Sequence, residues 1–232
     1  MSKQTKEKMV RQPKVNRFVH WTAAISIIML IITGLGQMPL YGRYLGPNPP
    51  AMLEWLQSYE ITLWVHYIAA SVLIFTIVFH AIHHLIRKEF AIIPKKGDVK
   101  GSYHLMKAMI LKKEEPPSHK YLPEQRLAYA LFAFSIILLI VTGAFKVYQN
   151  ISGGSLSNSM MVIMTNGHNI GTVLIIFAFI GHMAAFLFKD NRKMMPGMFT
   201  GKVDKDYIKH RHSLWYEELQ EKKRKKKKKK VS

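Results

Sequence analysis

The stretch GHNIGTVLIIFAFIGHMAAFLFK, from Gly167 to Lys189, decides the fold, because it is apolar over the length of a membrane span and carries two histidines. His168 and His182 are fourteen residues apart. In a helix this spacing puts them roughly 21 Å apart along the axis and on nearly the same face. An ionisable side chain inside a span is costly, so its default interpretation is functional. Two such side chains on one face indicate two ligand sites stacked across the bilayer, and a pair of haems is the best-matching ligand.

Three other apolar runs reach about twenty residues, which is the length that crosses a bilayer. The sequence therefore predicts an all-α, integral membrane four-helix bundle with spans at 18–38, 61–86, 127–147 and 160–188. The first span has no small-residue cleavage site after a short apolar core, so we interpret it as a retained helix. The expected organisation is an N-terminal segment (1–16) ordered only by lipid or a partner, a transmembrane domain (17–188) and a basic tail (189–232).

The net charge of +20 is distributed unevenly along the chain. Six Lys or Arg and one acid lie in 1–17, ten and five lie in 87–126, and sixteen and six lie from 189 onward. The connectors 39–60 and 149–159 hold a single basic residue, Arg43. Because positive loops stay cytoplasmic, both termini and the middle connector are expected inside a bacterial or archaeal inner membrane. We interpret the basicity as a topology signal and a contact with membrane lipid, and not as nucleic-acid binding.

The chain contains no cysteine. Covalently attached c-type haem, thiolate-held iron–sulfur clusters and disulfides are therefore excluded in this chain. A redox cofactor here has to be held noncovalently, and histidine is the expected ligand.

Two neutral imidazoles at the same depth on different helices form a bis-histidine haem site. Near the outer side the candidates are His66 and His168. Near the inner side His182 has two candidate partners, His20 and His80. Bare spacing favours His80, which lies as far from Arg87 as His182 lies from Lys189 and repeats the fourteen-residue interval with His66.

The four spans form a weak internal repeat. SIIMLIITGL, from Ser26, matches SIILLIVTGA, from Ser135, and HYIAASVLIFTIVFH matches HNIGTVLIIFAFIGH. This alignment puts Gly34 opposite Gly143 and His66 opposite His168. Between the two halves, a segment near SYHLMKAMILKK is amphipathic and is expected to lie along the inner membrane face. His104 and His119 are expected to be solvated, and His210 and His212 are not expected to be ligands.

Several short patterns together give a family resemblance. They are Arg17-Phe18-x-His20, Thr33-Gly34, Val141-Thr142-Gly143, the His168/His182 pair, Gly197-Met198-x-x-Gly201-Lys202-Val203 and His212-x-x-Trp215-Tyr216. With these the chain resembles the cytochrome b (gamma) membrane subunit of respiratory formate dehydrogenases, a group similar to the cytochrome b subunits of nickel–iron hydrogenases. The tail patterns favour formate dehydrogenase.

The resemblance implies two b haems, with His20 paired to His182 and His66 paired to His168. His80 would then line a quinone pocket beside the inner haem. Family members carry Asn-x-x-Gln near the start of the third span, where this chain keeps only the glutamine. The resemblance thus places His80 and Gln125 in the pocket, and by their position in the chain His83, His84 and Arg126 are expected beside them.

The implied function is electron transfer from an iron–sulfur beta subunit at the outer face to menaquinone or ubiquinone near the inner face. Formate chemistry would belong to a catalytic alpha subunit, so no catalytic residue is expected in this chain. One alternative is the same module serving a hydrogenase or a thiosulfate-type reductase. Another is a haem-free anchor or transporter, although a metal site would gather its ligands at one depth and not fourteen residues apart.

Overall fold

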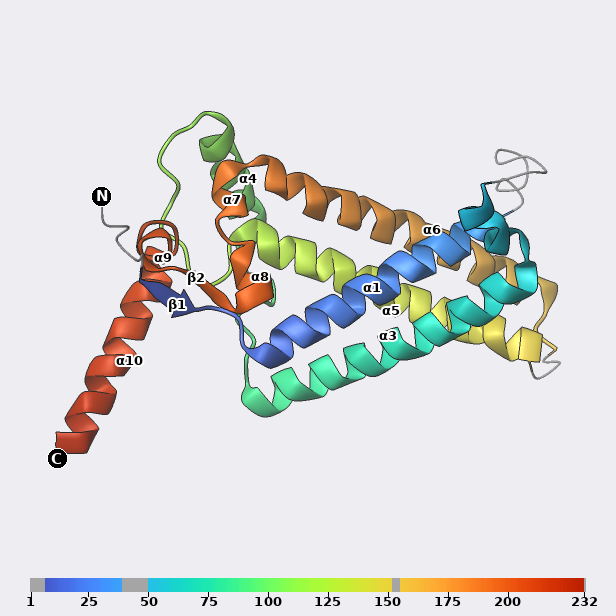
Figure 1. Ribbon diagram of the computed structural model, residues 1–232, viewed down its shortest axis with the longest axis horizontal. Helices are drawn as coiled ribbons and strands as arrows, with labels where there is room; N and C mark the ends of the chain where they lie inside the picture. Colours follow the sequence, from blue (N-terminus) through green and yellow to red (C-terminus); the bar gives the residue numbers. More distant parts are fainter. Residues whose placement is uncertain (1–6, 39–49, 152–154, 232) are drawn as a thin grey trace. The chain divides into compact units, whose positions relative to one another are not determined.

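The computed structural model describes residues 7–38, 50–151 and 155–231, and it is built almost entirely of helices (Figure 1). Within these described residues, four helices are long and apolar enough to cross a membrane. They are α1 (Lys14–Gly36), α3 (Tyr59–Arg87), α5 (Pro123–Ile151) and α6 (Asn158–Ala184). Each coincides with a predicted span and begins a few residues earlier than predicted. The predicted all-α membrane bundle is therefore confirmed.

The chain divides into two compact units. One, here called the bundle unit, comprises Lys14–Lys88 and Ile136–Ile176, and therefore holds α1, α3 and the adjoining parts of α5 and α6. The other, here called the terminal unit, comprises Met1–Pro13, Glu89–Ser135 and Phe177–Ser232. The unit boundary passes through α5 and α6, so each of these helices contributes to both.

Glycines allow close helix packing in the bundle unit. A Cβ atom added at Gly171 of α6 would lie 2.9 Å from Cγ of Leu139 on α5, and one at Gly167 would lie 3.0 Å from Cγ2 of Thr142. Close approach at small residues is a usual way for membrane helices to associate, since lipid gives no hydrophobic force between them. In the predicted outer loop, residues 39–49 with Arg43 lie outside the described residues. From Ala51 to Gln57 the chain forms the short helix η1.

A two-stranded sheet joins the two ends of the chain in the terminal unit. Strand β1 (Lys8–Val10) pairs antiparallel with β2 (Lys202–Asp204), with Met9 opposite Val203. The expectation that residues 1–16 are ordered only by lipid or a partner is therefore wrong for this strand. Its backbone hydrogen bonds are made within the chain, and Met9 packs against a core formed by Val203, Tyr207, Ile208 and Trp215.

The part of the chain after α6 also forms a series of helices. They are η2 (Ala185–Leu187), α7 (Lys189–Arg192), α8 (Pro196–Thr200), α9 (Lys205–Arg211) and α10 (Ser213–Val231). Gly201 ends α8 in the left-handed region, with φ at 79°, a conformation that glycine adopts without the steric cost of a side chain. The glycine of the tail pattern thus turns the chain from α8 into β2.

The middle connector contains an amphipathic helix, as predicted. In α4 (Asp98–Ile110), Leu105 is fully buried while Val99 and Ile110 are exposed. A buried ion pair between Asp98 and Arg126 links the start of α4 to the first turn of α5. Nε of Arg126 donates to Asp98 at 2.8 Å, and these bonds hold the pKa of Asp98 below its usual range. The helix is thus attached to the end of a membrane span.

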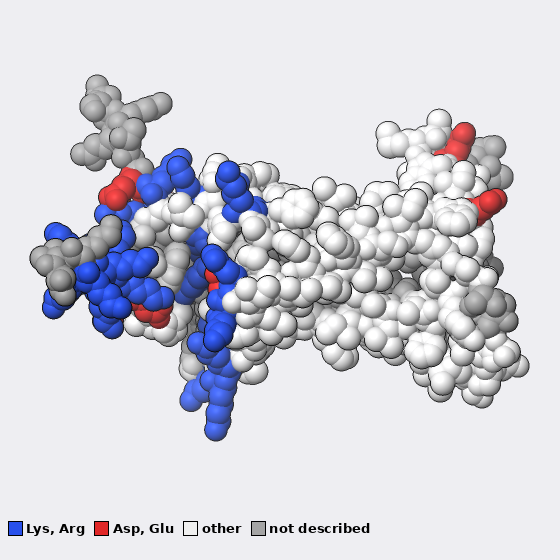
Figure 2. All heavy atoms as spheres, turned by 90° about the horizontal axis from the view of Figure 1, so that it is seen from below, with Lys and Arg blue, Asp and Glu red and all other residues white. Residues whose placement is uncertain are grey.

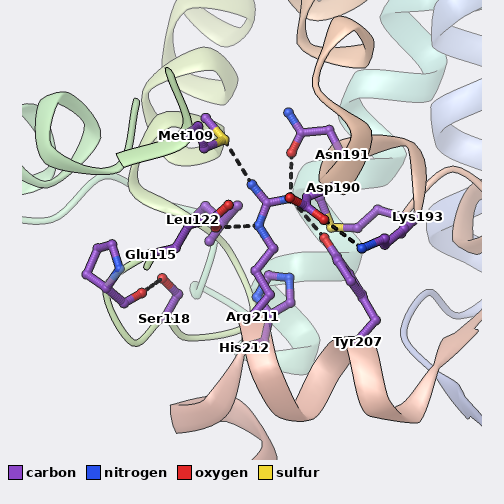
Figure 3. Close-up of polar contacts among 12 residues, drawn as sticks. Met109, Glu115, Ser118, Leu122, Asp190, Asn191, Lys193, Tyr207, Arg211 and His212 are labelled. Atoms are coloured by element: carbon purple, nitrogen blue, oxygen red, sulfur yellow. Dashed lines mark hydrogen bonds and ion pairs between the residues drawn. The ribbon is translucent and has the colours of Figure 1, made fainter. Parts of the chain in front are cut away.

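Arg211 ties four separate segments of the terminal unit together (Figure 3). Its guanidinium donates to Glu115 at 2.7 Å, to Asn191 at 2.8 Å and to the Tyr207 hydroxyl at 3.0 Å, and it contacts the Met109 sulfur at 3.2 Å. The arginine is only 6% exposed. A buried charge is tolerated when its donors are satisfied in this way, so the tail is fastened to the connector.

The neighbouring His212 is fully buried. Its Nδ1 donates to the backbone carbonyl of His119 at 2.7 Å, and the rings of Tyr207 and Trp215 contact it edge-on. His104 and His119 are exposed, as expected. Figure 2 shows Lys and Arg side chains gathered over the terminal unit, whereas the long helical surface of the bundle unit is almost free of them.

Candidate functional site

His66 of α3 and His168 of α6 face each other in the bundle unit. Their ring centroids are 6.4 Å apart, and the planes of the two rings are inclined at 55°. The two residues come from different halves of the internal repeat, so no local sequence contact brings them together. The structure therefore places side by side the two histidines that spacing alone assigned to one depth.

Each of these imidazoles is hydrogen-bonded to a threonine on the preceding span. Nδ1 of His66 lies 2.8 Å from Oγ1 of Thr33 on α1, and Nδ1 of His168 lies 3.0 Å from Oγ1 of Thr142 on α5. Both threonines are buried. The same contact thus occurs twice, at equivalent positions of the repeat.

A glycine follows each threonine and borders the same imidazole ring. A Cβ added at Gly34 would lie 3.6 Å from Cε1 of His66, and one added at Gly143 would lie 3.4 Å from Cε1 of His168. Because the glycines lack this atom, neither position puts a side chain against the ring edge. The predicted equivalence of Gly34 with Gly143 and of His66 with His168 is borne out by these matched contacts.

The pair fits the axial ligation of a haem iron. A nitrogen bound on each side at about 2 Å from a metal puts two imidazole centres roughly 6 Å apart, close to the separation in the structure. In the part of the chain that the structure describes, no group of three or more His, Asp or Glu side chains is arranged to hold a metal ion. Two imidazoles are sufficient for haem, because the macrocycle supplies the remaining ligands.

The histidines expected at the second haem divide between the two units. His182 belongs to the terminal unit, where Phe132 and Phe186 contact its ring edge-on at 6.1 and 5.9 Å. His20 and His80 belong to the bundle unit. The ring of His20 contacts Trp21, with centroids 5.1 Å apart, and the ring of His80 contacts His84, with centroids 4.3 Å apart. The pairing of His182 with His20, or with His80, stays a prediction.

The residues expected in a quinone pocket divide in the same way. His80, His83 and His84 form a run of ring contacts at the end of α3, whereas Gln125 and Arg126 lie in the first turn of α5. The guanidinium of Arg126 donates hydrogen bonds to Asp98 and, at 2.7 Å, to the backbone carbonyl of Tyr121. Gln125 accepts from the Leu122 backbone at 3.2 Å. Arg126 thus has a structural role of its own, and the quinone pocket stays a prediction.

Sequence reasoning missed the role of Thr33 and Thr142. Both appeared only as parts of Thr-Gly patterns, although they occupy the same position in the two halves of the repeat. That shared position was the signal that could have identified them. What the sequence could not supply was their partner, since each threonine contacts a histidine 33 or 26 residues further along the chain.

A family model described as prokaryotic cytochrome b561, of the nickel-hydrogenase cytochrome b type, matches residues 11–201. The match covers all four long helices and ends at Gly201, before β2 and α10. A search of curated proteins gave no match.

Proposed function

Because the chain belongs to the family of prokaryotic cytochromes b561, we propose that it is the dihaem membrane subunit of a respiratory formate dehydrogenase. Membership of the family indicates a multi-pass membrane protein that binds haem b and transfers electrons. The observation that carries the proposal further is the His66–His168 pair, with ring centroids 6.4 Å apart between two halves of a repeat.

When bound, haem b supplies one-electron redox chemistry. The role of the protein is to hold the haem and to orient it. His66 and His168 would hold the first haem. Following the family resemblance, His20 and His182 hold the second, and His80 lies beside a quinone pocket.

The partners proposed for this chain are an iron–sulfur subunit at the outer face and a catalytic subunit that carries out the formate reaction. The tail patterns that favour formate dehydrogenase contribute Val203 and Trp215 to the core of the terminal unit, together with the buried His212. The second candidate is the cytochrome b subunit of a nickel-containing hydrogenase. It is favoured by the type of the matching family.

Electrons would pass to menaquinone or ubiquinone near the cytoplasmic side, where the basic terminal unit lies under the positive-inside rule. Drawing the protons for quinol formation from that side would let electron flow build a membrane potential. A reporter fused after Ser232, or inserted near Lys112, would report a cytoplasmic location. An external signal from both would invert this orientation.

The test of the proposed function is spectroscopic. The purified chain should give a reduced-minus-oxidised visible spectrum of a b-type cytochrome, and quinone should reoxidise the reduced protein. In membranes of the source organism, formate should reduce these haems and hydrogen should not. Reduction by hydrogen alone would favour the hydrogenase candidate, and a chain that binds no haem would support an anchor or transporter.

A further inference from the structure

Two buried hydroxyl groups meet the two imidazoles of the His66–His168 pair. Thr33 is fully buried and Thr142 is 4% exposed. Each occupies the position directly before a glycine that borders the same ring. The contact is made to Nδ1 in both cases, at 2.8 and 3.0 Å. The question is which partner gives the hydrogen in these bonds.

The direction of the bonds follows from a second contact of each hydroxyl. Oγ1 of Thr33 lies 2.7 Å from the carbonyl oxygen of Met29, and Oγ1 of Thr142 lies 2.7 Å from that of Leu138. A carbonyl oxygen only accepts, so the single hydrogen of each hydroxyl is given to the carbonyl. The hydroxyl oxygen then has only lone pairs for the histidine, and Nδ1 has to be the donor.

A neutral imidazole carries one N–H, and its other nitrogen holds the free lone pair. With the hydrogen on Nδ1, the nitrogen left for iron is Nε2 in both His66 and His168. We propose that Thr33 and Thr142 are a matched pair of positioning residues that fix both axial histidines in this tautomer and tune the reduction potential of the haem they hold. The inference rests on the proposed function, in which these two histidines bind a haem.

The chemical effect of such a bond is predictable. An acceptor at Nδ1 increases the electron density of the imidazole and so favours ferric over ferrous iron, and it also fixes the orientation of the ring. A threonine hydroxyl that is itself donating to a carbonyl is a polarised acceptor, but it carries no charge. It therefore orients the ligand with a milder lowering of the potential than a carboxylate would cause.

The same helices provide a control for the purely structural role of such hydroxyls. Thr76 of α3 is 2% exposed, and its hydroxyl donates to the carbonyl of Val72 at 2.7 Å. Among the described residues it makes no hydrogen bond to a histidine. Replacing Thr76 by valine removes a buried hydroxyl and its bond to the helix backbone, and leaves both imidazoles untouched.

The experiment compares the full-length, haem-loaded variants Thr33→Val, Thr142→Val, Thr33→Ser and Thr76→Val with the parent protein in nanodiscs. Three quantities are measured: the midpoint potential of each haem, the EPR signal of the ferric low-spin haems and the rate of haem loss to apomyoglobin. Thr33→Val and Thr142→Val should each raise the potential of one haem and shift its EPR signal, and should accelerate loss of that haem by about tenfold or more. Thr33→Ser and Thr76→Val should behave like the parent.

Two results would overturn this inference alone: a parent with two b haems whose valine variants keep both potentials and both EPR signals, or an equal shift in Thr76→Val. If Thr33→Val binds no haem at this site, the Thr33→Ser variant tests the inference instead. It keeps the hydroxyl acceptor, so its haem has to keep the parental midpoint potential, and a changed potential would overturn the inference. A parent chain that binds no b haem would overturn the proposed function, and the inference with it.

Discussion

Two histidine environments in this protein differ in what surrounds the imidazole rings: the partly buried pair His66 and His168, and the fully buried His212. At the His66–His168 pair, each Nδ1 bonds to a threonine hydroxyl, and the rings face each other across 6.4 Å. At His212, Nδ1 bonds to a backbone carbonyl, and Nε2 is buried with no hydrogen-bond partner among the described residues. Aromatic side chains of Tyr207 and Trp215 pack against that ring. Burial alone therefore does not single out a candidate ligand; His66 and His168 are candidates because a second imidazole lies 6.4 Å away.

The largest effect expected from this difference is on haem content. His66→Ala or His168→Ala would remove a proposed haem ligand, so each variant should retain one b haem against the two expected in the parent protein. His212→Ala removes a histidine that is buried more deeply than either of them and should retain both. The pyridine haemochrome assay measures the ratio of haem to protein. Loss of a haem in His212→Ala would mean that His212 supports a haem site. The distinction drawn between His212 and the His66–His168 pair would then be wrong.

The second prediction concerns the partner of His182. The family resemblance predicts that His20→Ala loses the second haem and keeps the haem of the His66–His168 pair, because removal of an axial imidazole breaks a metal–ligand bond. His80→Ala should keep both haems, with altered quinone kinetics. Visible spectra of the two variants distinguish the alternatives. The reverse outcome would assign the second haem to His80 and His182, on α3 and α6.

The third prediction concerns the ion pairs of the terminal unit. Asp98→Ala leaves Arg126 buried without its carboxylate, and breaking a buried pair in this way costs about 3–5 kcal/mol. Hydrogen exchange should then be faster in α4 and at the start of α5. Asp190→Ala is the matched control, because the Asp190–Lys193 pair is exposed and such pairs contribute about 1 kcal/mol or less. Equal effects of the two variants would show that α4 is held by other contacts.

The smallest effect is a pH dependence of the terminal unit. Burial, with a smaller contribution from the charge of Arg11, lowers the pKa of His212 from 6.5 to about 4. Between these values the unfolded tail binds a proton that the folded tail does not, so stability is full above pH 6.5 and falls as the pH decreases toward 4. The loss is on the order of 2–3 kcal/mol.

Protection of α9 and α10 from hydrogen exchange, measured between pH 7 and pH 4.5, reports this loss. The His212→Phe variant should lose the pH dependence in that interval. If the His212→Phe variant keeps the full pH dependence, another titrating group causes it. The burial of His212 would then not explain the pH dependence of the terminal unit.

The bundle unit was largely predictable from the sequence, because its determinants are periodic or repeated. Apolar runs of membrane-spanning length located α1, α3, α5 and α6, and the repeat aligned Gly34 with Gly143. Equal depth in the membrane then left His66 and His168 as partners. Each of these inferences follows from a geometric rule that acts along one helix or between two copies of one motif.

The terminal unit was not predictable in the same way. Arg211 contacts Glu115, which is 96 residues away in the chain, and β1 pairs with a strand almost two hundred residues later. Contacts between single polar side chains leave no periodic pattern in a sequence. Residues that the sequence analysis assigned to a membrane-face connector, an N-terminal segment and a basic tail therefore include a small packed core, which only the structure reveals.

The central claim is that His66 and His168 bind the same haem, and haem counting in a double variant tests it most directly. If the two histidines share one iron, the variants His66→Ala, His168→Ala and His66→Ala/His168→Ala should all retain one b haem per chain, against two in the parent. The second substitution then removes nothing further. A double variant that retains no haem, while each single variant retains one, would place the two histidines at different haems and contradict the account.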